Sequence, residues 1–296
     1  MSTSNIKLPD FDALWDYGNP GASEQQFRAL LPTAQQSGDR SYHAQLLAQI
    51  ARAEGLQRRF ADAHATLDAA LALLTAGMGQ AHIRYLLERG RVFNSSGQIE
   101  QARPLFLEAW EAAQALQEDF YAVDAAHMLG IVEPLDQQLG WHLRALGLAQ
   151  QSQQPRARKW LGSLYNNIGW TYHEIGQYQQ ALDSFEKALQ AREAADSSAT
   201  EIRIARWCVA RALRSLQQFE AALAMQRRLY EELEHSDAND GYVCEELGEC
   251  LLALNRPDES KQYFAQAYAA LSKDAWLAAN EPARVQRLHD LAHIAE

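Results

Sequence analysis

A residue pattern returns about every forty positions along this chain, and no other feature constrains the fold as strongly. The clearest copy runs from Gly162 to Ala195. In it, small residues such as Gly169 and Ala181 alternate with large apolar residues at helical spacing, and Gly176 marks a turn. This arrangement predicts two helices that pack tightly against each other. One such pair cannot bury its own apolar face, so the copies must stack as a solenoid.

The repeats are preceded by a different kind of segment. Residues 1–43 predict an irregular leader followed by a capping helix, with Ser23 as its N-cap and Gly38 near its end. The leader contains Phe11 and Trp15, which are too apolar for a free tail. We therefore expect the leader aromatic residues to pack on the first helices.

Six copies occupy residues 44–274, and they start near positions 44, 83, 123, 162, 203 and 241. Residues 275–296 contain a last helix, predicted over 282–294, which matches no second helix of a repeat. A solenoid needs a polar cap at its open end, and this helix is expected to supply the cap.

The third copy departs from the pattern. Pro134 falls near the end of its first helix, and the second helix, predicted over 135–151, begins about one turn early. Two interpretations stay open: a kink that shapes or hinges the binding surface, and neutral drift in a tolerant segment.

Composition excludes several classes of protein. The 296 residues are 47% hydrophobic, which is enough for a folded core, and the net charge of -11 argues against a nucleic-acid-coating protein. No apolar run approaches the roughly 20 residues of a membrane span, and no secretory signal opens the chain. The only cysteines are Cys208, Cys244 and Cys250, an odd number that suits a reducing cytoplasm.

The copies resemble the tetratricopeptide repeat family, and the resemblance covers roughly residues 44–274. The copy at 162–195 matches the family pattern at nearly every position. Successive starts lie 38 to 41 residues apart, against about 34 in the usual repeat, which resembles the longer-period branch of bacterial regulatory proteins and motor light chains. The resemblance implies an all-α, right-handed superhelical solenoid of helical hairpins with helical caps. Its first helices would line a concave groove that binds extended peptides or partner helices.

The resemblance also implies which side chains face the groove. This candidate peptide-binding set is mainly cationic and aromatic, although the whole protein is acidic. It consists of Arg52, Arg84, Arg91, His127, Asn166, Trp170, His173, Trp207, Arg211, Arg214 and Tyr242.

We expect this groove to bind an anionic, extended segment that carries an apolar anchor. Trp170 and Trp207 would form the apolar pocket, because tryptophan often anchors interfaces. Arg91, Arg211 and Arg214 would bind carboxylates, because the arginine fork matches that group. The alternative is that the arginines pair with carboxylates such as Glu88, Asp124 and Glu174 of this chain, and that the tryptophans pack between repeats.

One family subtype binds chaperone tails through a clamp of lysine, asparagine and arginine. Asn167 matches its asparagine, but His127, Ile204 and Cys208 stand where the clamp cations should be. A Glu-Glu-Val-Asp tail is therefore not the expected ligand.

No motif of catalysis stands out. His173-Glu174 lacks the second histidine of a zinc protease, and no phosphate loop or nucleophile elbow occurs. His289 and His293 share a helix face, but no carboxylate or cysteine cluster completes a ligand set. We predict no catalytic residue, no metal and no cofactor.

The sequence thus predicts a cytoplasmic scaffold or adaptor that binds another protein or peptide, with no nucleic acid or membrane as partner. The alternative is a regulatory sensor whose superhelix responds to a small peptide or metabolite, and an enzyme is the remote third. A homo-oligomer through Trp15 and Tyr17, or through the C-terminal helix, is left open.

Overall fold

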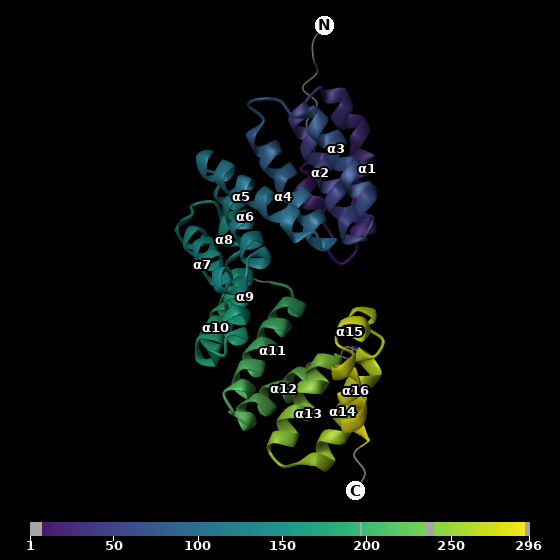
Figure 1. Ribbon diagram of the computed structural model, residues 1–296, viewed down its shortest axis with the longest axis vertical. Helices are drawn as coiled ribbons and strands as arrows, with labels where there is room; N and C mark the ends of the chain where they lie inside the picture. Colours follow the sequence, from purple (N-terminus) through teal and green to yellow (C-terminus); the bar gives the residue numbers. More distant parts are fainter. Residues whose placement is uncertain (1–7, 196, 235–239, 294–296) are drawn as a thin grey trace. The chain divides into compact units, whose positions relative to one another are not determined.

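The computed structural model describes residues 8–195, 197–234 and 240–293, and no strand occurs within these ranges. The chain is an all-α array of helical hairpins (Figure 1). It forms two compact units, Met1–Trp160 (unit 1) and Leu161–Glu296 (unit 2).

Unit 1 begins with the leader and a single helix, and continues with three hairpins and a short helix. Its elements are η1 (Phe11–Leu14), α1 (Pro20–Ser37), the hairpins α2 (Arg40–Leu56) with α3 (Phe60–Leu73), α4 (Gly79–Ser95) with α5 (Ile99–Ala115) and α6 (Asp119–Val132) with α7 (Leu135–Gln151), and α8 (Pro155–Arg158).

Unit 2 contains three further hairpins and a helical end. They are α9 (Leu161–Glu174) with α10 (Tyr178–Ala194), α11 (Ala199–Ser215) with α12 (Phe219–Glu234) and α13 (Gly241–Ala253) with α14 (Pro257–Leu271), followed by α15 (Ala275–Asn280) and α16 (Pro282–Ala292).

Helix α16 packs against α14 through an apolar cluster that contains Leu288 of α16 and Phe264 of α14, so it covers the end of the last hairpin. The predicted end of this helix, Ile294, lies outside the described residues. The boundaries at 43 and 274 between caps and repeats stay predictions.

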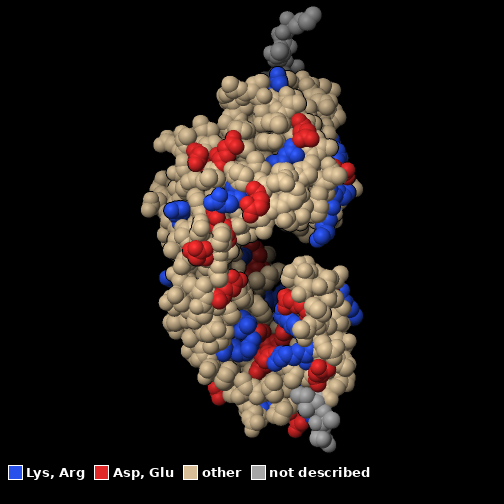
Figure 2. All heavy atoms as spheres, in the orientation of Figure 1, with Lys and Arg blue, Asp and Glu red and all other residues tan. Residues whose placement is uncertain are grey.

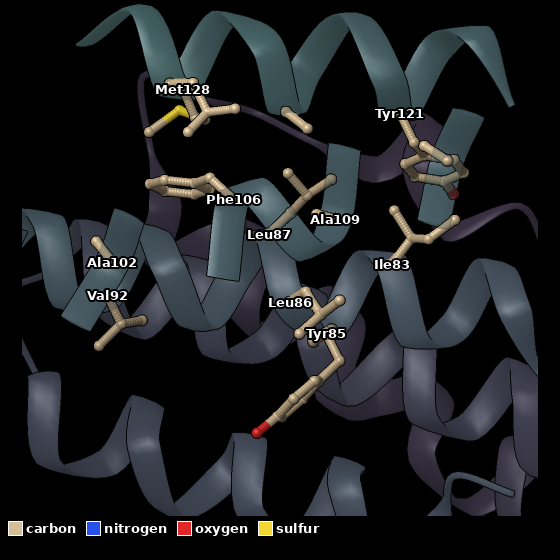
Figure 3. Packing of buried hydrophobic residues seen from close by; sticks show 14 of the residues in the cluster. Ile83, Tyr85, Leu86, Leu87, Val92, Ala102, Phe106, Ala109, Tyr121 and Met128 are labelled. Carbon is tan, nitrogen blue, oxygen red and sulfur yellow. The ribbon is translucent and has the colours of Figure 1, made fainter. Parts of the chain in front are cut away.

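The core runs between consecutive hairpins, as the sequence pattern requires. In unit 1, Ile83 and Leu87 of α4 lie with Phe106 of α5 below Tyr121 and Met128 of α6 (Figure 3). Each hairpin thereby buries the apolar face that it cannot bury alone.

The N-terminal helix begins earlier than its predicted N-cap. Pro20 occupies the first turn, where a missing N–H costs nothing, and the side chain of Asn19 accepts a hydrogen bond from the Ala22 N–H at 3.1 Å. Ser23 as N-cap is therefore wrong: it is buried and bonds the backbone of Asp16 instead. The predicted end is confirmed, because Gly38 caps the helix with φ 72.

The third hairpin is shortened, as the sequence predicts. Helix α6 ends at Val132 and α7 spans Leu135–Gln151, so only Glu133 and Pro134 connect them. The proline thus stands between the helices, two residues after the end of α6 and immediately before α7. The fixed φ of proline suits the position immediately before a helix.

Candidate functional site

The first helices of neighbouring hairpins lie next to one another within each unit. We call the face formed by α2, α4 and α6 the first-helix surface of unit 1, and the face formed by α9, α11 and α13 that of unit 2. All residues predicted for the peptide-binding set lie on these helices.

The leader lies on the first-helix surface of unit 1. Asp12 forms a two-pronged ion pair with Arg84, at 2.6 Å and 2.8 Å, and accepts a third bond from Arg156 at 2.9 Å. Arg84 also donates a hydrogen bond to the hydroxyl of Tyr121, at 2.8 Å. Burial alone would raise the pKa of Asp12, but the two guanidinium groups overcome it and hold that pKa below its ordinary value.

Aromatic side chains fasten the rest of the leader. The indole N–H of Trp15 donates to Gln49 Oε1 at 2.6 Å, and the Trp15 and Tyr17 rings stack with centroids 4.8 Å apart. The guanidinium of Arg52 lies over both rings, at 5.7 Å and 5.4 Å. Phe11 is buried at the start of the segment. The expected packing of the leader aromatic residues is confirmed.

Beside the leader, a chain of ion pairs links the three first helices of unit 1. Arg52 and Arg91 both donate to Glu88 Oε1, at 3.1 Å and 2.8 Å, and Arg91 also pairs with Asp124. His127 lies near this chain, and burial lowers its pKa to about 4, so its imidazole is neutral near pH 7. The two arginines and two carboxylates balance in charge.

In unit 2, aromatic side chains follow one another across successive first helices. Trp170 of α9 and Trp207 of α11 have ring centroids 6.0 Å apart, and Tyr242 of α13 follows at 6.3 Å from Trp207. Both tryptophans are half-buried and also contact the cores between hairpins. We call these three residues the aromatic row.

Charged side chains flank the aromatic row. Glu246 binds Arg214 through two bonds, at 2.6 Å and 2.9 Å, and Arg211 lies 3.2 Å from the same carboxylate. Burial lowers the pKa of Arg211 although Glu246 opposes the shift. Helix α16 adds Arg284 on Glu245 and Arg287 on Glu249.

The remaining predicted residues of unit 2 lie beside the aromatic row. His173 shares a hydrogen bond with Ser215 at 2.8 Å, and burial lowers its pKa to about 4. Asn166 accepts a bond from the thiol of Cys208 at 3.5 Å.

The predicted arginines are therefore not free. Arg52, Arg84, Arg91, Arg211 and Arg214 each have a carboxylate partner. The alternative of internal pairing is thus confirmed for Glu88 and Asp124, whereas Arg211 and Arg214 use Glu246 in place of the expected Glu174. Figure 2 accordingly shows basic and acidic side chains side by side on the visible face. A role in peptide binding stays a prediction.

Several residues of these surfaces were missed. Asp12 reaches the surface of unit 1 from the leader and Arg156 reaches it from α8, and no local spacing indicates such contacts. Gln49 lies on α2 itself but is not in the predicted set. The ion pairs of Glu245 and Glu249 with the arginines of α16 could have been predicted from the sequence. Glutamates four apart on α13 and arginines three apart on the last helix form matching faces.

The described residues offer little for catalysis. Within 8–195, 197–234 and 240–293, no group of three or more histidine, cysteine or acidic residues could hold a metal ion. In the same ranges no helix is long and apolar enough to cross a bilayer. Burial raises the pKa of the Cys208 thiol to about 12, far from that of a nucleophile.

Comparison with known proteins fits this geometry. The family model described as tetratricopeptide repeat matches residues 163–193. No curated protein matches the chain in sequence.

Solved structures show the same fold at low identity. The apo form of RapI is 11% identical and has a TM-score of 0.69, with 94% of this chain and 82% of that one covered. A signal-transduction ATPase with a tetratricopeptide repeat sensor, from Pyrococcus horikoshii, is 12% identical with a TM-score of 0.69, over 92% of this chain and 42% of that one. BtubC from P. vanneervenii is 14% identical with a TM-score of 0.59, over 78% and 94%.

Proposed function

This chain is a tetratricopeptide repeat protein, and from that premise we propose that it is an interaction module that binds an extended acidic segment of another protein. Stacked helical repeats generally serve as scaffolds for protein–protein interaction. The proposal assigns the binding to the first-helix surfaces and gives the protein no catalytic role. We propose a cytoplasmic setting, which suits three buried free cysteines.

One observation carries the proposal: the first-helix surface of unit 1 already holds a short acidic segment with aromatic anchors, which includes the 3-10 turn η1. That segment is the leader, which places one carboxylate between Arg84 and Arg156 and an indole beside Gln49. The surface therefore has the chemistry needed for a ligand of this class.

The first-helix surface of unit 2 has related chemistry. Two arginines, Arg211 and Arg214, share the single carboxylate of Glu246. The half-buried rings of Trp170 and Trp207 lie beside them and offer apolar area to an anchor side chain. An acidic residue next to an apolar one fits this arrangement.

The test is selection of peptides on the full chain. A displayed library of random peptides should yield sequences in which Asp or Glu accompanies Trp, Phe or Leu. The double variant Trp207→Ala, Arg211→Gln should lose these peptides. The matched control Tyr263→Ala, Arg227→Gln changes the same residue classes on second helices and should keep them.

Circular dichroism would first establish that both variants remain helical. Enrichment of basic or purely apolar peptides would contradict the proposal. If both variants bind the acidic peptides equally well, the aromatic row is not the site that binds them.

A further inference from the structure

The leader is bound as a ligand would be, through three distinct anchors. Phe11 packs in an apolar cluster with Phe27 and Leu46. The Asp12 carboxylate accepts hydrogen bonds from the guanidinium groups of Arg84 and Arg156, and Trp15 donates its indole N–H to Gln49. These anchors follow the order aromatic, acid, two further residues, tryptophan. Protein surfaces commonly select a short peptide by binding anchor side chains at fixed offsets along it.

The surface beneath the leader requires a carboxylate. The side chain of Arg84 is only 6% exposed, and Asp12 is its sole ion-pair partner among the described residues. The other group that its guanidinium hydrogen-bonds is the hydroxyl of Tyr121. A buried arginine without a carboxylate is strongly unfavourable, so an acidic group must occupy this position.

The leader fills the surface only in part. A hollow of about 90 Å³ remains between Asp12, Trp15 and the helices, and Tyr17 is 61% exposed. A second cleft of about 490 Å³ adjoins Phe11 and Asp12, and its walls include Gln45, Gln80 and Gln153. Amide side chains can both donate to and accept from an extended backbone. A longer segment with the same anchors would make contacts that the leader lacks.

We infer that the first-helix surface of unit 1 is a recognition site for a segment of another protein with the pattern aromatic-Asp-x-x-Trp, and that the leader is its built-in competitor. The inference rests on the proposed function. It adds the sequence pattern of the ligand and a means of regulation, in which the leader blocks binding of the partner. Binding in trans then requires the leader to leave the surface.

The probe is a fluorescent peptide with the sequence of residues 8–18 of this chain. It is titrated into the full chain and into the double variant Asp12→Ala, Trp15→Ala, which weakens the leader. The variant should bind the probe at least tenfold more tightly than the wild type. Adding Arg84→Gln should abolish the gain, and a probe with asparagine in place of the aspartate should bind at least tenfold more weakly.

Asp12→Ala leaves the buried Arg84 without an ion-pair partner, which destabilises the fold. The single variant Trp15→Ala weakens the leader but keeps the Asp12–Arg84 ion pair. The probe should raise the melting temperature of either variant and leave that of the wild type unchanged. Equal affinity for wild type and variants, or no affinity for any, would overturn the inference. The peptide selection on the full chain is judged by a variant in unit 2, Trp207→Ala with Arg211→Gln, and does not depend on that outcome, so the two proposals fail separately.

A second copy of the chain is the competing occupant. Light scattering over a range of concentrations distinguishes it from a different protein. A wild-type monomer is the expected result. A wild-type dimer that the double variant abolishes would place the leader of one copy on another and would overturn the assignment to a different protein.

Discussion

At the residue scale, a glycine and a phenylalanine sixteen positions later hold three of the hairpins together. The pairs are Gly90 with Phe106, Gly169 with Phe185 and Gly248 with Phe264. A Cβ on Gly169 would lie 2.5 Å from the Phe185 ring, closer than carbon atoms can approach. The missing side chain is what lets the two helices meet.

Gly169→Ala should therefore destabilise the protein by about 1–3 kcal/mol, because the phenylalanine ring must move. The matched control is Gly140→Ala, within helix α7, where nothing lies within 4 Å of the added carbon. That change should stabilise by about 0.5–1 kcal/mol through helix propensity. Urea unfolding measures both, and a loss of stability in both variants would contradict the packing argument.

Gln226 occupies the corresponding position of the fifth repeat, sixteen residues after Ala210. It is fully buried, and neither of its amide atoms has a hydrogen-bond partner among the described residues. In the first repeat the same spacing joins Ala51 and Leu67, which are both buried.

Gln226→Leu should raise stability by about 1–3 kcal/mol, because it removes a buried amide that lacks partners. The reverse change in the first repeat, Leu67→Gln, should destabilise. Thermal unfolding of both variants provides the check. A lower melting temperature for Gln226→Leu would mean that the amide is satisfied in solution.

These pairs could be predicted from the sequence, because a fixed spacing of sixteen is visible in it. The ion pairs could be predicted only in part. Arg91 pairs with Glu88 one turn away and with Asp124 on the next first helix, and both partners were expected. Arg84 pairs with Asp12, which is 72 residues away in the leader and outside the repeats, and no periodicity links the two.

At the element scale, the third hairpin shows how a shorter connection changes the core. Because α7 begins one turn early, His142 rather than a phenylalanine packs on the glycine of the first helix, Gly130. Burial lowers the pKa of His142 to about 4, and the ring is neutral near pH 7.

Stability should accordingly depend on pH. Below its ordinary pKa near 6.5, His142 takes up a proton in the unfolded chain, while in the folded chain it does so only near 4. The free energy of unfolding is thus greatest above pH 6.5 and decreases as the pH falls toward 4. This residue contributes about 2 kcal/mol of that decrease between about pH 7.5 and about pH 5.

The substitution His142→Phe keeps a ring on Gly130 and removes the titration. Urea midpoints at the two pH values should differ less for this variant than for the wild type. An equal pH dependence in both proteins would show that other groups cause it.

Helix positions were largely predictable, since the predicted span of the second helix in the third hairpin, 135–151, is the span found. The start of α1 was not, because the residue that caps it, Asn19, lies four residues before the expected cap, Ser23. Ser23 does not cap the helix because its hydroxyl hydrogen-bonds the backbone of Asp16 in the leader, and spacing in the sequence does not reveal that contact.

At the scale of the whole molecule, each hairpin contacts mainly its neighbours, so local damage should stay local. Hydrogen exchange of Gly169→Ala should be faster in α9 to α12 and unchanged in α2 to α5. Mass spectrometry of peptides from each helix gives the comparison. A uniform increase across both units would mean that the array unfolds as one cooperative block.

The central claim is that partners bind the first-helix surfaces. The most direct measurement is cross-linking from a photoreactive residue placed at Tyr242, on α13 in the aromatic row, and at Leu143, an exposed position on the second helix α7. With an acidic peptide obtained from the selection, the account predicts cross-links from position 242 and none from position 143. Cross-links from position 143 alone would contradict it.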